Sequence, residues 1–590
     1  MRDSDSSTGQ LLSNDANANA DALHQLGLAH FRDGKLDRAC EQLDRALNVA
    51  PDRADIWEHR GLLAALRGDR IAAEAFYYRA LSLSGGSASL HRNLADCLKL
   101  SARFIEARQH YLQALSSEPT LHHAVRALAE ISTEQKQYAD AADYWLRAWA
   151  LDSTNVADAS MLIAALSKAR RDAEIDGLLP TLRACCAADA AALQELAFAL
   201  NGAERFADAI SVARQGIAID PHNAWLHHNA SFAFNMLGDF QQMHVHAAEA
   251  ARLMPDHALM QFNLAAAQLR AGDFERGWKQ YRWHDALPEN HDLVRPDFPE
   301  WQGERVLGCR FLLVGEQGLG DQIQFLRMAD WLHRRGARVD VWVEGPLGDI
   351  AREAAGVHAA WATVPPGPYD FWCRMLRMPA HMNLDMSMLP LAAPYLNAEP
   401  AKAQRWRDRV EALGTVGAQG PFRKRVGMVW AGNPAYVLDR YRSIPLQQWR
   451  PLLEQPGVRW FSLQKGDVQN DAEAWSEGID MHVLGPEIHN FSDTLAIIQS
   501  LDLVITVDTA VAHLAGACGT PVWVLVPTFT DWRWVVERAD SPWYPSMRLF
   551  RQRELNQWDT VLAEVAQALR EYVADEPDAR GASEPCATSV

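Results

Sequence analysis

The stretch Phe311-Leu-Leu-Val-Gly-Glu-Gln-Gly-Leu-Gly-Asp321 joins an apolar run to a glycine-rich turn and an amphipathic run. The pattern predicts a buried strand over 311–314, a loop that carries Gly318 and Gly320, and a helix that begins near Asp321. Such a junction exposes backbone N–H groups and the positive end of a helix dipole, so it suits an anionic ligand. Many glycine-rich junctions bind nothing, and the interpretation therefore depends on the sequence on either side.

The chain has 590 residues, which is too long for one hydrophobic core and predicts two to four domains. Its formal net charge of −18 argues against a nucleic-acid-binding protein, which needs a basic face. The eight cysteines form no CxxC pair with metal-ligand spacing, so we expect reduced thiols. Neither a signal peptide nor a transmembrane segment is apparent, and we expect a cytoplasmic protein.

Before the quoted stretch, the chain repeats itself. Residues 1–19 are polar and predict a disordered arm. From Ala20 a pattern recurs every 34 residues through about eight units, without an insertion. Small residues return where two helices of a hairpin must approach closely, and a proline often ends the second helix. The small residues include Gly27, Gly61, Ala95, Ala129, Ala39, Ala73, Ala107 and Ala141, and the prolines are Pro51, Pro119, Pro221 and Pro255.

This pattern resembles the tetratricopeptide repeat and predicts an α-solenoid over residues 20–290. Stacked hairpins of this kind form a superhelix with a concave groove. The groove either binds a peptide or partner protein, or it only holds the neighbouring domain or mediates self-association. Trp278, Trp283 and Trp301 lie at the end of the array and predict a packed connection to the next domain.

After Arg310 short apolar runs alternate with helical patterns. This alternation predicts parallel sheets with helices on both faces. The length suits two Rossmann-like domains, 305–414 and 425–574, that face each other across a cleft, followed by a disordered tail over 575–590. The predicted strands are 311–314, 339–343, 371–376, 426–430, 460–463, 503–507 and 522–526, and the predicted helices are 322–335, 347–355, 401–413, 446–453, 493–500, 509–517 and 556–574.

A second strand–helix junction follows the apolar run 503–507. The run ends at Asp508, and a helix is predicted to begin at Thr509. The unpaired N–H groups of Thr509, Ala510 and Val511 would then point into the cleft, where they can hold a diphosphate without a metal.

Two side chains at this junction have alternative interpretations. His513 lies one turn after Thr509 on the same helix face and can donate to a phosphate oxygen. It is equally a histidine packed under the loop. Asp508 is interpreted more simply as an N-cap than as a ligand contact.

Two further loops follow predicted strands and open on the same cleft. One carries Gly432 and Asn433, followed by Arg440 and Arg442, and the other carries Lys465. Glycine permits close approach of the backbone, and cationic side chains can neutralise a diphosphate. The alternative for each cation is a solvated surface residue, but three loops at one sheet edge favour a functional interpretation.

Asp321 is the best candidate for a general base, because a carboxylate at this position can take a proton from an attacking hydroxyl. Its alternative is an N-terminal cap of the following helix. Glu316 is a second candidate base or holds the loop. The sequence has no GxSxG motif and no GxxxxGK[ST] phosphate loop, and its D-x-D motif lies in the predicted arm. We therefore predict no metal site.

With these motifs in view, the second half resembles GT-B glycosyltransferases of family 9, the heptosyltransferase-like group. The matching segments are the glycine loop that ends at Asp321, the D-T-x-x-x-H segment from Asp508 to His513, and 426–432. The resemblance implies an inverting, metal-independent transfer from a nucleotide-diphosphate sugar, without a cofactor. It also implies that Asp321 is the catalytic base and that Thr509, Ala510 and His513 bind the diphosphate.

Repeats joined to a GT-B domain also resemble the O-linked N-acetylglucosamine transferases, which modify proteins held in the groove. The donor sugar and the acceptor therefore stay open, and a protein or peptide is one candidate acceptor. Arg440, Arg442 and the segment Asp531-Trp-Arg-Trp534 either shape the pocket or pack. The rival interpretation of the whole chain is a non-catalytic scaffold whose repeats bind partners beside an inert GT-B-like module.

Overall fold

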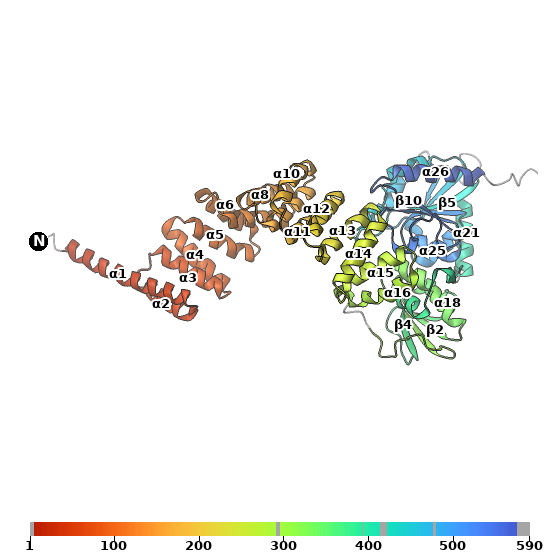
Figure 1. The fold of residues 1–590 in the computed structure, drawn as a ribbon, viewed down its shortest axis with the longest axis horizontal. Coiled ribbons are helices and arrows are strands. Elements are labelled where there is room, and N and C mark those ends of the chain that lie inside the picture. The colour runs from red at the N-terminus through yellow and green to blue at the C-terminus, as the bar shows by residue number, and fades with distance from the viewer. Residues whose placement is uncertain (1–4, 291–294, 392, 414–421, 476–478, 575–590) are drawn as a thin grey trace, which may run out of the picture. The chain divides into compact units, whose positions relative to one another are not determined.

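The computed structural model describes residues 5–290, 295–391, 393–413, 422–475 and 479–574. The chain divides into two compact units, Met1–Pro221 and His222–Val590. The first unit contains helical repeats alone. The second contains the last repeats and the α/β region (Figure 1).

The helical repeats form antiparallel hairpins of the kind that the 34-residue period predicts. Alanines at the recurring small positions, such as Ala39, Ala73 and Ala107, are fully buried between the paired helices. The helices of the first unit are α1 Asp5–Arg32, α2 Leu36–Val49, α3 Ala54–Leu66, α4 Arg70–Ser84, α5 Ala88–Leu100, α6 Phe104–Ser117, α7 His122–Glu134, α8 Tyr138–Leu151, α9 Val156–Lys168, α10 Asp172–Cys185, α11 Ala190–Gly202 and α12 Phe206–Ile219. Those of the second unit are α13 Ala224–Leu237, α14 Phe240–Leu253, α15 Ala258–Arg270 and α16 Phe274–Tyr281.

The N-terminal segment differs from the prediction. Helix α1 begins at Asp5, within the stretch 1–19 that the sequence assigns to a disordered arm. The first repeat supplies the nucleus of this helix, and each further residue then adds a hydrogen bond without a new nucleation cost. Residues 1–4 and the predicted tail 575–590 lie outside the described residues.

The α/β region contains two parallel sheets, one with the strand order β3-β2-β1-β4 and one with the order β10-β9-β8-β5-β6-β7. The first sheet consists of β1 Arg310–Val314, β2 Arg338–Trp342, β3 Val357–Trp361 and β4 Phe371–Arg374. The second consists of β5 Lys424–Val429, β6 Val458–Ser462, β7 Met481–Val483, β8 Leu503–Val507, β9 Val522–Val526 and β10 Met547–Arg551. The predicted α/β class with parallel sheets is confirmed, and the GT-B assignment stays a prediction.

The central strands of the second sheet match the prediction most closely. Strands β8 and β9 are fully buried along their length and have the predicted bounds. The helices around the sheets are α17 Leu319–Phe325, α18 Arg327–His333, α19 Gly348–Arg352, α20 Met378–Met382, α21 Pro400–Leu413, α22 Asp439–Arg442, α23 Arg450–Leu453, α24 Phe491–Ile498, α25 Ala510–Cys518 and α26 Asp559–Ala574. Among the described residues, none of the helices is long and apolar enough to span a bilayer.

The predicted domain bounds stay a prediction, and the packing of two segments bears on them. Helix α21 was assigned to the first sheet's domain, but it packs on α24 beside the second sheet. The indole of Trp406 donates to Asp493 at 3.2 Å, and Lys402 lies 3.4 Å from the same carboxylate. The repeat helices end at Tyr281, inside the predicted array 20–290, and the last repeats, from His222 on, belong to the same compact unit as the α/β region.

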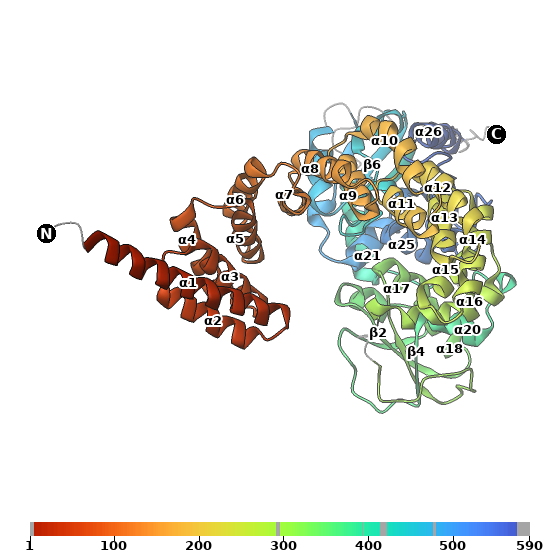
Figure 2. The ribbon, with the colours of Figure 1, turned by 60° about the vertical axis from the view of Figure 1, so that its left-hand side comes forward.

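Aromatic packing explains why the last repeats belong to the second unit. The ring of Trp278 in α16 lies 5.0 Å from that of Trp532 and 5.9 Å from that of Phe325. Phe274 stacks on Trp543 at 5.8 Å. These contacts join the repeats to both sheets, and α15 and α16 lie directly beside the α/β region in both views (Figure 1, Figure 2).

Candidate functional site

A cavity of about 1140 Å³ opens between the two sheets, at the ends of their strands. Its walls come from loops that follow β1, β5, β6, β8 and β9, together with residues of the repeat helices α13 and α15. Parallel strands of α/β proteins carry ligand sites at this end. The cavity is lined by nearly all the predicted site residues: Gly318, Gly320, Asp321, Asn433, Arg442, Lys465, Asp508, Thr509, Ala510 and His513.

Asp321 is the third residue of helix α17, and its side chain has two partners. One carboxylate oxygen accepts the backbone N–H of Gly318 at 2.9 Å, so Asp321 caps the helix from its third position, whereas the N-cap residue is Gly318 and not Asp321 as the alternative had it. The other oxygen forms an ion pair with Arg533. The carboxylate is 17% exposed and lines the cavity, so capping the helix does not remove it from the site.

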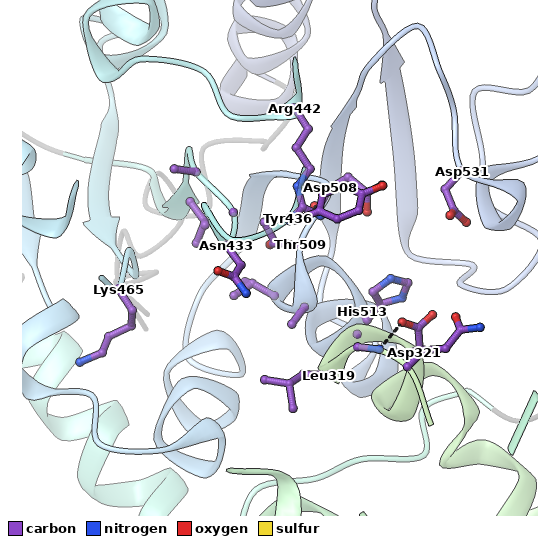
Figure 3. Close-up of a pocket in the computed structure, with 18 of the residues that line it drawn as sticks. Leu319, Asp321, Asn433, Tyr436, Arg442, Lys465, Asp508, Thr509, His513 and Asp531 are labelled. Atoms are coloured by element: carbon purple, nitrogen blue, oxygen red, sulfur yellow. Dashed lines mark hydrogen bonds between the residues drawn. The ribbon is translucent and has the colours of Figure 1, made fainter. Parts of the chain in front are cut away.

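Gly320 brings the two halves of the site together. A Cβ atom at this position would lie 2.8 Å from Cδ2 of His513. Only a glycine lets the start of α17 approach α25 this closely without a shift of the neighbouring ring. Asp321 and His513 are consequently neighbours in the cavity wall, although their helices follow strands of different sheets (Figure 3).

The start of helix α25 has unpaired backbone donors, as predicted. Thr509 is the N-cap residue, and its side chain caps none of the helix N–H groups. Within the described residues, the N–H groups of Ala510 and Val511 have no acceptor. Both residues line the cavity, so the positive end of the helix dipole faces it.

The N-cap alternative for Asp508 is wrong. Its carboxylate accepts the indole N–H of Trp534 at 2.9 Å instead of a helix N–H. Burial raises the pKa of this carboxyl, and the Trp534 hydrogen bond opposes the shift. The residue therefore ties β8 to the segment after β9 and lies beside the helix start without capping it.

His513 is packed beneath the loop, as one of its two alternatives has it, and it also lines the cavity; its role as a donor to a phosphate oxygen stays a prediction. Its ring stacks on Trp534 at 5.2 Å, and Nδ1 lies 3.0 Å from the hydroxyl of Tyr544. Burial, and then the charge of Arg327, lower the pKa of His513 to about 3. The imidazole is accordingly neutral near pH 7. If the tyrosine hydroxyl donates to Nδ1, Nε2 carries the proton and can donate into the cavity.

Arg442 is fixed against the wall of the second sheet. It donates to the carbonyl of Asp508 at 2.9 Å and to the carboxylate of Asp439 at 2.8 Å. A Cβ at Gly432 would lie 2.6 Å from its guanidinium, which explains the glycine in this loop. The side-chain oxygen of Asn433 accepts the N–H of Ala435 at 3.0 Å, so its amide N–H₂ remains available.

The two other predicted cations lie less centrally. The ammonium of Lys465 donates to the carbonyls of Gly485 and Ile488, at 2.9 Å each. It lines the cavity at a distance from Thr509 (Figure 3). Arg440 does not line the cavity; it stacks over the ring of Tyr441 at 4.8 Å.

Sequence reasoning missed the roles of Asp531 and Arg533. The carboxylate of Asp531 accepts the backbone N–H of Arg533 at 3.0 Å and its guanidinium at 2.7 Å. Burial, and then the charge of Asp508, raise the pKa of Asp531 to about 7, and burial lowers the pKa of Arg533 to about 10. Their local motif, Asp531-Trp-Arg-Trp534, stood out in the sequence, but nothing in it indicated the distant partner Asp321.

A second buried polar cluster lies behind the glycine loop, where the repeats end. Ligand-type atoms of His284, Asp285 and Glu316 lie within 4.8 Å of one another, and among the described residues this is the one group with such spacing. Arg374 and Arg377 already bind Asp285, at 3.2 and 3.5 Å. These guanidinium groups supply the positive charge that a metal would otherwise bring, so we assign the cluster a structural role.

Glu316 holds the loop, as one of its two predicted roles requires. It accepts the N–H of Leu376 at 2.8 Å, and burial raises its pKa to about 7 from an ordinary 4.5. Between those pH values the unfolded chain releases this proton while the folded chain keeps it. The free energy of unfolding should therefore fall by about 3 kcal/mol as pH rises from 4.5 to 7.

The substitution Glu316→Gln tests this effect, because glutamine imitates the protonated carboxyl. Denaturant unfolding, followed by tryptophan fluorescence, should show wild type and E316Q equally stable near pH 4.5 and the variant more stable at pH 8. Parallel pH profiles would contradict the assignment.

Comparisons with known proteins identify the repeats and give two curated relatives. The tetratricopeptide repeat family matches residues 20–53, so the solenoid is one of tetratricopeptide repeats. Protein FlbA of Caulobacter vibrioides is 27% identical over 392 residues, which cover 61% of this chain and 63% of FlbA. Protein O-mannosyl-transferase TMTC1 of Mus musculus is 36% identical over 74 residues, 12% of this chain and 8% of TMTC1. The solved PilF of Pseudomonas aeruginosa is 18% identical, with a TM-score of 0.27, over 42% of this chain and 97% of PilF.

Both curated relatives are longer than the matched regions. The chain spans somewhat under two thirds of FlbA and a small fraction of TMTC1.

Proposed function

We propose that this chain is a glycosyltransferase that moves a sugar from a nucleotide-diphosphate sugar to a hydroxyl acceptor. The single observation that carries the proposal is the shared cavity: a carboxylate, Asp321, on the side of the first sheet and an uncapped helix start, at Thr509, on the side of the second. The family 9 resemblance adds the expected fold, GT-B, and an inverting, metal-independent reaction.

The diphosphate would lie on the start of α25. The N–H groups of Ala510 and Val511 donate to its oxygens, and the hydroxyl of Thr509 and Nε2 of neutral His513 add two donors. Because the pKa of His513 is low, the ring stays neutral near pH 7 and donates this hydrogen bond without taking up a proton. Arg442 adds a positive charge beside the same helix start, because its guanidinium is held on the carbonyl of Asp508.

Two polar residues extend this donor site along the wall of the second sheet. The free amide N–H₂ of Asn433 can donate to the donor substrate. Lys465 keeps its ammonium on two backbone carbonyls, so it contributes charge from a distance.

In the reaction, an acceptor hydroxyl attacks the anomeric carbon on the face opposite the diphosphate. The bond from the acceptor oxygen to that carbon forms while the bond to the phosphate oxygen breaks, and the hydroxyl proton passes to Asp321. Attack from the opposite face inverts the configuration. The helix dipole and Arg442 stabilise the negative charge that develops on the departing nucleotide.

The acceptor that the repeats favour is a protein or peptide. Asn235 in α13 and Arg270 in α15 line the cavity, so the wall of the proposed active site includes tetratricopeptide repeats. TMTC1, which is similar over 74 residues, is named as a protein O-mannosyl-transferase. A cytoplasmic location, expected from the sequence, belongs to the same proposal.

A thermal-shift panel of nucleotides and nucleotide sugars tests donor binding. A ligand at about a hundred times its Kd should raise the free energy of unfolding by about 2.7 kcal/mol. The matching sugar should then be transferred when it is incubated with cell lysate, as mass spectrometry of modified proteins would detect. Absence of any shift across the panel would contradict the donor site.

A second candidate, a non-catalytic scaffold, is favoured by one observation. The ion pair with Arg533 holds the charge of Asp321, and the guanidinium must move before the carboxylate can take a proton. A scaffold would give partner binding through the repeats and no transfer of any sugar in the panel, even where a nucleotide binds.

A further inference from the structure

We propose that Arg270, at the end of repeat helix α15, is a positioning residue for the catalytic carboxylate. It holds the segment 527–536, which follows β9, and this segment carries the arginine that pairs with Asp321. The inference rests on the proposed function, and it assigns the last repeat a part in catalysis that does not depend on which acceptor binds.

The segment 527–536 contacts three residues of the proposed site: Asp321, Asp508 and His513. Arg533 pairs with Asp321, and Asp531 fixes that guanidinium at 2.7 Å. The indole of Trp534 donates to Asp508 and stacks on His513. A displacement of this segment would thus disturb the base and the diphosphate site together.

The repeats hold the same segment from the other side. Nε of Arg270 donates to the carbonyl of Thr530 at 2.6 Å, and the carbonyl of Arg270 accepts the N–H of Val536 at 3.0 Å. One helix end therefore binds both ends of the stretch 530–536. Thr528 donates its hydroxyl to the carbonyl of Met236 at 2.8 Å, which adds a contact to the end of α13.

The backbone of this segment is strained. Val535 has a φ of 41°, which is a genuine outlier for a β-branched residue. Strain of this kind persists only where surrounding contacts over-determine the conformation, and it gathers at functional sites. Arg551 donates to the carbonyls of Trp534 and Val535, at 2.7 and 2.6 Å, and Arg270 binds the chain on either side. Loss of the Arg270 side chain removes the contact with Thr530 and leaves the backbone hydrogen bond to Val536 in place. The segment should then relax around Thr530.

The guanidinium of Arg270 is itself well held. It lies 5.6 Å from the ring centre of Phe240 and 3.7 Å from the sulfur of Met243. Burial lowers its pKa to about 10, so it is charged at neutral pH. Because Arg270 also lines the cavity, direct contact with a substrate is the competing role, and the experiment must separate the two.

The test compares full-length Arg270→Ala with wild type by steady-state kinetics and by amide hydrogen exchange without substrate. We expect kcat to fall at least tenfold, KM for the nucleotide sugar to change less than threefold, and exchange to rise within 528–536. Arg270→Lys, which retains one donor for the Thr530 carbonyl, should recover part of kcat. Arg276→Ala is the matched control, because it removes an arginine of the same hairpin whose side chain is 78% exposed, and it should behave as wild type.

Two outcomes would overturn the inference: unchanged exchange in R270A, or unchanged kcat. An unchanged kcat with a raised KM indicates direct substrate contact instead. If R270A does not fold, Thr528→Val carries the test, since it removes only the hydrogen bond to Met236 and should change kcat and exchange in the same direction. The exchange experiment needs no substrate. Failure of the proposed function, with no transfer by wild type, is therefore distinct from failure of the positioning role.

Discussion

Replacement of Asp321 by asparagine should lower sugar transfer by a factor of about 10²–10⁴, the usual contribution of a general base. Asparagine retains an oxygen that can accept the Gly318 N–H, so the cap of α17 persists. It cannot take the proton of the acceptor hydroxyl. Binding of the nucleotide should change by less than about threefold, because the diphosphate lies on α25, and titration calorimetry measures this directly.

Asp321→Ala provides the comparison for the structural role of the carboxylate. Both variants lose the base and the charge that pairs with Arg533, and the alanine variant also loses the cap. If catalysis depends on the base, both variants are inactive, and the alanine variant is the less stable of the two. An asparagine variant with normal turnover would remove Asp321 as the base and leave it as a helix cap with an ion-pair partner.

Arg533 gives Asp321 a second partner that the mechanism must release. A buried guanidinium between two carboxylates, those of Asp321 and Asp531, can turn from one to the other without losing all of its hydrogen bonds. Release of Asp321 therefore leaves Arg533 paired with Asp531, and the carboxylate becomes able to take the proton of the acceptor hydroxyl.

Sequence periodicity was sufficient for the repeats and for the central strands. Buried strands such as 522–526 are continuous apolar runs, and such runs predict their own position. The missed strands are peripheral ones. They are β3, β7 and β10, and each lies at the edge of its sheet. Two arginines interrupt β10, His358 interrupts β3, and β7 has only three residues, so none of them is a continuous apolar run of typical strand length. Helix α21 was predicted correctly as a helix but assigned to the wrong sheet, because its buried residue Trp406 does not identify its partner.

The residues of the candidate site also fall into two groups, those that the sequence predicts and those that it does not. Residues at strand–helix junctions, such as Asp321 and Thr509, are visible in the sequence because their position follows from local chemistry. Residues whose role depends on a distant partner are not. Arg270 lies 260 positions before its acceptor, Thr530, and no local pattern predicts that contact. Such long-range positions require the folded chain.

The start of helix α25 offers the sharpest test of the donor site, because a single residue changes its charge. Ala510 is the first residue of the helix and lines the cavity. A carboxylate at the start of a helix interacts favourably with the helix dipole, by about 0.3–1 kcal/mol. The same charge would occupy the position where the diphosphate is proposed to bind. Stability and binding should therefore respond in opposite directions.

Ala510→Glu should weaken binding of the nucleotide and its sugar by at least about 100-fold, since two negative charges about 4 Å apart repel by several kcal/mol near a protein surface. Its melting temperature should equal or exceed that of wild type. Ala510→Gln is the matched control: it has nearly the same size without the charge, so the difference between the two variants in titration calorimetry isolates electrostatics from steric blocking. Equal affinities in both variants, or nucleotide binding in A510E at the wild-type Kd, would place the diphosphate away from α25.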